Sequence, residues 1–285
     1  ELRRFAFDGS NQAKIISDVN PDLIFCGHWP AMTLCAKPSQ AVVIDLAGPH
    51  LLERHYQGMP NQIGAVLAKL NAVSKADYFV VSGPAQRLYF LSFLLRAEIQ
   101  NPENRIVTIP MPLSPEIPKR PAVDCIHFPH FVFGGVFLPW QDPAQGLRQI
   151  STALSSRHQG LLSLIGGKHP NYDIKSGIYA ELFDELLQNP RVKSLPLLPY
   201  PEFINELLTK DVAVDLMKWN LERQLAVTIR TTTYLWSGVP VIYNDYADLG
   251  RLISSYDAGW CVDPGNTAAL DAVLAEIFDN PAMLR

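Results

Sequence analysis

The sequence lacks the motifs of several common enzyme classes. It has no G-x-G-x-x-G dinucleotide turn, no G-x-x-x-x-G-K-[ST] phosphate loop, no G-x-S-x-G nucleophile elbow and no H-E-x-x-H metal pair. The seven histidines do not group with cysteines at zinc spacing, and no D-x-D pair is present to bridge a metal and a sugar nucleotide. These absences argue against NAD-dependent, triphosphate-hydrolysing, serine-hydrolase and zinc-hydrolase chemistry, and we expect no bound metal.

Cysteine and positive charge are also scarce. None of the four cysteines forms a C-x-x-C pair, and Cys26 and Cys261 lie in apolar runs, so we expect buried free thiols and a reducing, cytoplasmic compartment. The net charge of −4 shows no excess of basic residues of the kind that binds the phosphates of nucleic acid. No apolar run reaches the roughly 18 residues needed to span a bilayer, and no signal peptide is visible.

Ten short apolar runs alternate with helical patterns along the 285 residues. Most runs are continuously apolar, which is typical of parallel strands covered on both faces. The pattern predicts an α/β protein with two Rossmann-like, doubly wound parallel sheets. The expected strands are residues 22–26, 41–45, 78–82, 105–109, 131–137, 161–165, 194–198, 211–215, 239–243 and 260–262.

A proline-rich linker separates the strands into two groups. Residues 111–123 read MPLSPEIPKRPAV, and four prolines there exclude one helix or a central strand. We therefore predict an N-terminal domain over residues 1–118 with four strands and a C-terminal domain over residues 119–285 with six. The chain opens at Glu1 and its first domain has few strands, so we expect that domain to be truncated.

The densest polar motif follows the expected strand at 211–215. A helix is predicted from about Thr228 to Ser237, ended by Gly238. Thr231 and Thr232 could cap it, and Arg230 would add a fork of donors for phosphate oxygens beside the helix N-terminus. The alternative is a capped surface helix in which Arg230 pairs with Glu222.

Glycine pairs end two strands of the second domain. Gly134 and Gly135 would let a ligand approach the backbone, and Gly167 is followed by the basic Lys168. Trp140, just beyond the first pair, could stack on a base or a sugar. The alternative is a pair of tight turns beside a core tryptophan.

Polar residues also follow two strands of the first domain. His28 follows the strand at 22–26, and Asp45, Gly48 and His50 follow or end the next one. They could supply a general base or hold sugar hydroxyls, or they could only cap helices and satisfy the backbone. Residues 90–95 (FLSFLL) could touch a membrane, although a buried helix face is the favoured alternative.

Several segments together resemble the GT-B nucleotide-sugar glycosyltransferases of the bacterial group 1 family. The segment RTTTYLWSGVPVIYNDYADLGRLI is similar to the donor-site helix of that family, which ends in glycine-x-proline before the next strand. The other segments occur in the order of the family and cover most of the chain: 76–82, 106–113, 133–143, 164–167, 198–208 and 211–215.

The resemblance implies a metal-independent hexosyltransferase that takes a sugar from a nucleotide diphosphate held by the second domain. A glycan or lipid-linked acceptor would bind the first domain, in cell-surface polysaccharide or lipopolysaccharide synthesis at the inner face of the membrane. No cofactor other than the donor is implied. The implied roles are as follows: catalytic, Asp45 and Arg230; donor-binding, Gly134, Gly135, Gly167, Lys168, Glu222, Arg223, Thr231 and Thr232; acceptor-side, His28, Gly48 and His50.

The sequence departs from the family at several positions. Leu225 and Thr233 stand where relatives carry two glutamates, and Val136 and Gln141 stand where a basic pair is usual. Asp45 replaces the family's first-domain histidine. These departures keep two alternatives open, a GT-B-like binding or partner subunit without catalysis and an epimerase of nucleotide sugars.

Overall fold

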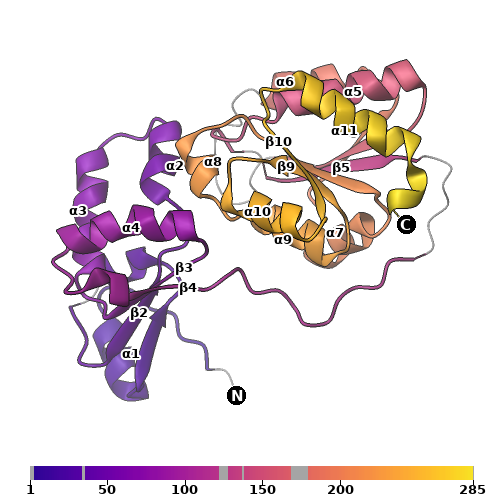
Figure 1. Cartoon of the computed structure of the whole chain (residues 1–285). Helices are drawn as coiled ribbons and strands as arrows, with labels where there is room; N and C mark the ends of the chain where they lie inside the picture. Colours follow the sequence, from indigo (N-terminus) through magenta and orange to yellow (C-terminus); the bar gives the residue numbers. More distant parts are fainter. Residues whose placement is uncertain (1–2, 34–35, 122–127, 137, 168–178, 285) are drawn as a thin grey trace. The chain divides into compact units, whose positions relative to one another are not determined.

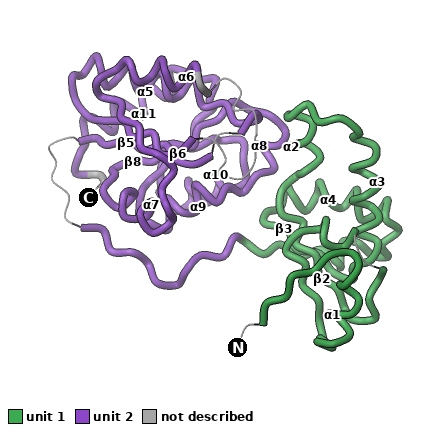
Figure 2. Tube along the Cα trace, turned by 180° about the vertical axis from the view of Figure 1, so that it is seen from behind, with its two compact units in different colours: residues 1–110 green, residues 111–285 purple. Residues whose placement is uncertain are grey.

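The computed structural model describes residues 3–33, 36–121, 128–136, 138–167 and 179–284. It divides into two compact units, Glu1–Pro110 and Met111–Arg285 (Figure 2). The division lies in the proline-rich segment between the two sheets, eight residues before the boundary expected from the sequence. Residues 109–121 form no helix or strand.

Unit 1 contains one parallel sheet with the strand order β1-β2-β3-β4 (Figure 1). Proline at the first position of α4 fits the helix start, where a backbone N–H is not needed. The strands are β1 (Leu23–Cys26), β2 (Ala41–Asp45), β3 (Tyr78–Val81) and β4 (Ile106–Thr108). The helices are α1 (Gln12–Val19), η1 (Trp29–Thr33), α2 (His50–Tyr56), α3 (Gln62–Val73), α4 (Pro84–Arg96) and η2 (Pro102–Asn104).

Only one face of this sheet is well covered by the described residues. Side chains on the covered face, such as Val42 and Phe79, are fully buried. On the opposite face Phe25 is 58% exposed and Val107 is 49% exposed, and α1 buries none of its residues. The expectation that the apolar strands are covered on both faces is therefore wrong for unit 1. The run at residues 90–95 places three of its six residues in the core: Phe90, Phe93 and Leu94.

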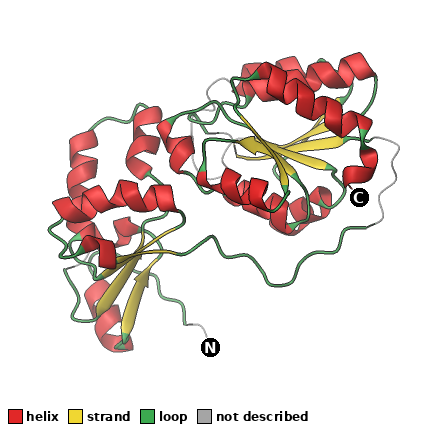
Figure 3. Ribbon diagram, in the orientation of Figure 1, coloured by secondary structure: helices red, strands yellow, loops and turns green. Residues whose placement is uncertain are grey.

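Unit 2 contains a six-stranded parallel sheet with the order β10-β9-β8-β5-β6-β7. Helices lie on both faces of this sheet (Figure 3). The strands are β5 (His130–Val136), β6 (Leu161–Gly167), β7 (Val192–Leu195), β8 (Val212–Asp215), β9 (Val241–Asn244) and β10 (Gly259–Val262). The helices are α5 (Ala144–Arg157), α6 (Tyr179–Leu186), α7 (Tyr200–Leu207), α8 (Leu221–Leu225), α9 (Ile229–Trp236), α10 (Asp248–Ser255), α11 (Thr267–Asp279) and η4 (Pro281–Leu284).

Two apolar cores cover the two faces of this sheet. Helices α5, α6 and α11 bury leucine and isoleucine stripes on one face, as their helical spacing predicts. Helices α7, α9 and α10 cover the other face, where Tyr234 of α9 is fully buried. All ten expected strands are confirmed, and the largest shift is at β7, which begins two residues before its expected start and ends three residues before its expected end.

The order of strands places a topological switch point between β5 and β8. From β5 the chain proceeds to β6 on one side, whereas β8, β9 and β10 continue on the other. In open α/β sheets ligands bind beyond the carboxyl ends of strands at such a point. The polar motifs that follow β5 and β8 lie there.

The described residues report on two further expectations. Cys26 is buried and Cys261 is half-buried, and neither forms a disulfide; the other two cysteines lie outside the described residues. Within the described ranges, no helix is long and apolar enough to cross a membrane.

Candidate functional site

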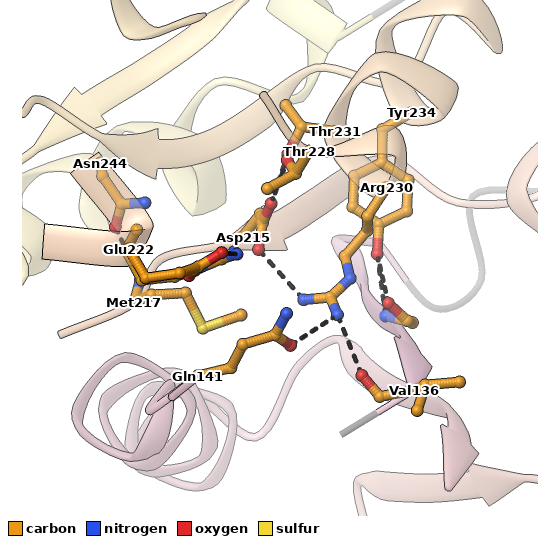
Figure 4. Close-up of polar contacts among 12 residues, drawn as sticks. Val136, Gln141, Asp215, Met217, Glu222, Thr228, Arg230, Thr231, Tyr234 and Asn244 are labelled. Carbon is orange, nitrogen blue, oxygen red and sulfur yellow. Dashed lines mark hydrogen bonds and ion pairs between the residues drawn. The ribbon is translucent and has the colours of Figure 1, made fainter. Parts of the chain in front are cut away.

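Asp215, at the carboxyl end of β8, is the centre of a buried polar network (Figure 4). Its side chain is 1% exposed. Arg230 Nη1 donates to Asp215 Oδ1 at 3.1 Å, and the hydroxyl of Thr228 donates to Oδ2 at 2.9 Å. The hydroxyl of Thr231 also donates to Oδ2. A carboxylate with little access to water needs such partners, because an uncompensated buried charge is costly.

Arg230 joins the ends of β5 and β8 to α9. Its Nη2 donates to Gln141 Oε1 at 3.0 Å and to the carbonyl oxygen of Val136 at 3.4 Å. The guanidinium lies over the ring of Phe133, 5.0 Å from its centroid. Its Nε is buried and has no acceptor among the described atoms. The side chain is 11% exposed, so Arg230 retains a narrow access to solvent and one free donor.

The alternative in which Arg230 pairs with Glu222 is wrong, because Arg230 pairs with Asp215. Glu222 instead forms a two-point ion pair with the adjacent Arg223, at 2.6 and 2.8 Å. Both side chains are almost fully buried in α8, whose first turn is capped by Asn220. Burial by itself would lower the pKa of Arg223, but the Glu222 carboxylate overrides it and the pKa lies above its ordinary value. These two predicted donor-binding residues are therefore bound to each other.

The threonines of α9 do not cap the helix. Thr231 is fully buried and bound to Asp215, and the Thr232 hydroxyl donates to the carbonyl oxygens of Thr228 and Ile229. Within the part of the chain that the structure describes, no side chain caps α9, whose N-cap residue is Thr228. The first-turn N–H groups of a helix have no partner inside it, so this end stays able to accept an anion.

The two glycines at the end of β5 make room for protein side chains. A Cβ on Gly135 would lie 2.9 Å from Arg230 Nε, and its φ of +128° is one that other residues rarely adopt. A Cβ on Gly134 would lie 2.8 Å from the ring of Phe203. The N–H of Gly134 donates to the hydroxyl of Tyr234 at 2.8 Å. Burial raises the pKa of Tyr234, so its hydroxyl stays protonated in this role.

Gly167 differs from these glycines. A Cβ there would meet no described atom within 4 Å. Lys168, predicted to bind the donor, lies outside the described residues. Trp140 is buried, as the alternative of a core tryptophan predicts, and its indole N–H has no acceptor among the described atoms.

In unit 1 the structure brings His28 and His50 together beside Trp29. The rings of the two histidines lie 6.3 Å apart, and that of Trp29 lies 5.6 Å from His50. His50 Nδ1 is 3.7 Å from Glu53 Oε2. Burial, followed by the positive charges of His50 and Lys69, lowers the pKa of His28. This pair of imidazoles with a carboxylate can bind a hydroxyl group or move a proton.

Lys69 lies beneath this cluster and was missed by the sequence analysis. It is fully buried and its Nζ has no hydrogen-bond partner among the described atoms. The amine lies 4.4 Å from the ring centroid of Phe90 and 5.6 Å from that of Trp29. Burial lowers its pKa to about 7, although Glu53 acts in the opposite direction. Its position on the apolar stripe of α3, four residues before Val73, was the available signal.

Asp45 and Gly48 have local roles. Asp45 Oδ1 accepts from the N–H of Ala47 at 2.9 Å, which supports Ala47 at a φ of +48°. A Cβ on Gly48 would lie 2.8 Å from Glu53 Oε1, so this glycine leaves space for that carboxylate. Asp45 keeps a second oxygen and is half-buried. Its part in catalysis stays a prediction.

No protein-family profile and no curated protein sequence matches the chain. Solved structures do. Sucrose-phosphate synthase from Thermosynechococcus elongatus is similar with a TM-score of 0.70 and 15% identity, over 97% of this chain and 69% of that one. Anabaena HepE in complex with UDP-glucose gives 0.66 and 15%, over 95% and 72%. S. aureus TarM in a complex that contains UDP gives 0.65 and 12%, over 95% and 52%.

The chain has the GT-B fold. The resemblance found in the sequence is thus confirmed at the level of the fold. Within the GT-B fold of this chain, the network around Asp215 and Arg230 lies at the switch point of unit 2.

Proposed function

We propose that this chain is a glycosyltransferase that moves a sugar from a nucleotide diphosphate to an acceptor hydroxyl. The observation that carries the proposal is the position of Arg230 and the uncapped N-terminus of α9 at the switch point of a GT-B unit. HepE, which shares this fold, was solved with UDP-glucose.

The proposed chemistry is stabilisation of the leaving diphosphate. As the bond between the anomeric carbon and the phosphate oxygen breaks, negative charge develops on that oxygen. The first N–H groups of α9, which carries Arg230 in its first turn, are fixed donors that can meet this charge without a metal. The carboxylate of Asp215 holds the guanidinium in place, which reduces the cost of ordering it during the reaction.

Unit 1 would hold the acceptor. His28, His50 and Glu53 form a group that can position a sugar hydroxyl and take its proton, and Asp45 is the alternative base. The proposal includes a glycan or lipid-linked acceptor, cell-surface polysaccharide synthesis and a cytoplasmic location at the inner membrane face. These finer parts rest on the resemblance of the sequence.

One observation favours binding without transfer. Asp215 neutralises Arg230, and Glu222 neutralises Arg223, so neither described arginine at the site offers an unpaired charge. A donor would then bind through neutral donors, and transfer would be slow or absent.

Calorimetric titration with UDP, UDP-glucose and GDP separates these possibilities when it is combined with product analysis. We compare the wild type with Arg230→Met and with Arg157→Met, a control whose arginine pairs with Asp279 at the surface of unit 2. We expect binding of at least one nucleotide to the wild type and to Arg157→Met, and loss of binding in Arg230→Met. Equal binding to Arg230→Met would remove this residue from the donor site.

Product analysis then identifies the reaction. Release of free nucleoside diphosphate with the sugar on an acceptor or on water supports transfer. Binding with an unchanged donor supports the partner subunit, and an epimerised donor supports the epimerase. Failure of every nucleotide to bind would refute the proposed donor site.

A further inference from the structure

A pocket separate from the network around Asp215 opens at the carboxyl edge of the unit 2 sheet. None of the residues discussed above as donor-binding lines it. It has a volume of about 460 Å³ and lies between the loop after β8, the start of α5 and the loop after β10. Its lining includes one aromatic ring, two carboxylates and two basic side chains: Trp219, Asp142, Asp263, Lys218 and Arg148. We call it the Trp219 pocket.

The indole of Trp219 forms a wall that is exposed and fixed. Its side chain is 55% exposed, and its Nε1 donates to Gln224 Oε1 at 3.1 Å. Both neighbours in sequence are tied to the segment before α5. The N–H of Lys218 donates to the carbonyl oxygen of Asp142 at 2.7 Å, and Asn220 Nδ2 donates to that of Trp140 at 2.6 Å. A large apolar ring held in this way loses little conformational entropy when a ligand stacks on it.

The two carboxylates are oriented in the same manner. Asp142 Oδ1 accepts from the N–H of Ala144 at 3.1 Å, and Asp263 Oδ1 accepts from the N–H of Gly265 at 2.8 Å. Each aspartate thus uses one oxygen to fix its loop and keeps the other. No ion pair joins either of them to a basic side chain among the described residues. Two free carboxylate oxygens in one pocket disfavour an anionic ligand.

Donors are also present on the lining. The guanidinium of Arg148 forms an ion pair with Glu185 at 2.6 Å, so the carboxylate offsets its positive charge. Lys218 is exposed and forms no ion pair within the described ranges. The pocket therefore combines an apolar ring with both acceptors and donors, and it has little net charge.

We propose that the Trp219 pocket binds a neutral saccharide. A pyranose has an apolar face of C–H groups that stacks on an indole and a rim of hydroxyls that both donate and accept hydrogen bonds. Asp142 and Asp263 accept from two hydroxyls and Lys218 donates to a third. This site goes beyond the proposed transfer reaction, because it requires neither a nucleotide nor Arg230.

The same chemistry could hold the hexose of a nucleotide sugar or a unit of a longer glycan. Binding is measured by saturation-transfer NMR and calorimetry on the whole chain with maltotetraose, cellotetraose, chitotetraose, UDP-glucose and UDP. A saturation-transfer signal from an oligosaccharide in the absence of UDP indicates that the pocket binds a glycan. A signal confined to the hexose protons of UDP-glucose indicates that it binds the donor sugar.

The variants are Trp219→Ala and Asp263→Asn, with Tyr256→Ala as the control. Tyr256 is an exposed aromatic residue of unit 2 outside the pocket. We expect Trp219→Ala to weaken saccharide binding about tenfold or more, corresponding to about 1.4 kcal/mol. Asp263→Asn, which can still accept from Gly265, weakens it several-fold, and Tyr256→Ala leaves it unchanged.

Two results would overturn the proposal. One is the absence of saccharide binding to the wild type up to about 10 mM, a weak limit even for carbohydrate subsites. The other is equal binding by Trp219→Ala when circular dichroism shows that it folds. Measuring UDP binding to the same variants distinguishes the two proposals. Saccharide binding without UDP binding would refute only the proposed transfer reaction. UDP binding without saccharide binding would refute only the saccharide site in the Trp219 pocket.

Discussion

The ion pair between Asp215 and Arg230 permits a quantitative test of the site. Asp215→Asn keeps the size of the side chain and one acceptor oxygen for the threonine hydroxyls, but it removes the negative charge. Arg230 then remains 89% buried without a counter-charge, because its side chain is 11% exposed. Removing one partner of a buried pair costs about 3–5 kcal/mol. Since Arg230 reaches solvent at one edge, we expect the low end, about 3 kcal/mol.

The measurement is a double-mutant cycle of Asp215→Asn and Arg230→Met by guanidinium unfolding. The chain has two units, so one transition cannot be assumed for the whole protein. Four of its five tryptophans belong to unit 2, so fluorescence mainly follows the relevant unit. We expect the double variant to be about 1.5–3 kcal/mol more stable than the sum of the single effects predicts. Additive effects, or a loss below about 1 kcal/mol for Asp215→Asn, would refute the argument.

Two further predictions concern single residues. Gly135→Ala should lose about 1–3 kcal/mol of stability in urea unfolding, because of its positive φ and the 2.9 Å approach to Arg230. Gly167→Ala should stay near the wild type, because its Cβ would meet no described atom within 4 Å. Lys69 has a pKa lowered to about 7 in the folded chain against 10.5 when unfolded, so between these values the unfolded state holds more protons. The wild type should therefore gain stability relative to Lys69→Met as the pH rises from about 7 to 10, by at most about 1.4 kcal/mol per pH unit. The control is Lys14→Met, at an exposed lysine, for which we expect a stability difference that does not change with pH. An equally constant difference for Lys69→Met would contradict the prediction.

The strands could be predicted from the sequence because a local signal is sufficient for them. A run such as 41–45 (AVVID) is short, apolar and β-branched, and it forms β2 with the same bounds. Covering of a sheet face is not local. The runs of β1 and β4 read like those of β5 and β6, yet one of their faces is open, because burial depends on which elements pack there.

The partner of Arg230 could not be predicted for a similar reason. Asp215 and Gln141 become its neighbours only because β8 pairs with β5. The sequence placed the arginine at the correct edge, but the one ion-pair partner it offered, as an alternative to a phosphate, was Glu222 of the same polar segment. The glycines at the end of β5 were predicted to admit a ligand, whereas in the structure Gly135 makes room for the guanidinium of Arg230 and Gly134 for the ring of Phe203.

The open sheet face of unit 1 has a practical consequence. Leu23, Phe25, Tyr78 and Val107 are each about half exposed, with Phe5 and Phe7 exposed to a similar degree. Environment-sensitive dyes that fluoresce on apolar surface report unfolding only when the native state binds little of them. This chain should bind such a dye while folded, so a dye-based melting curve would begin at high fluorescence. The increase in fluorescence on unfolding would then be small. Intrinsic fluorescence, calorimetry and circular dichroism are for that reason the suitable measurements of its stability.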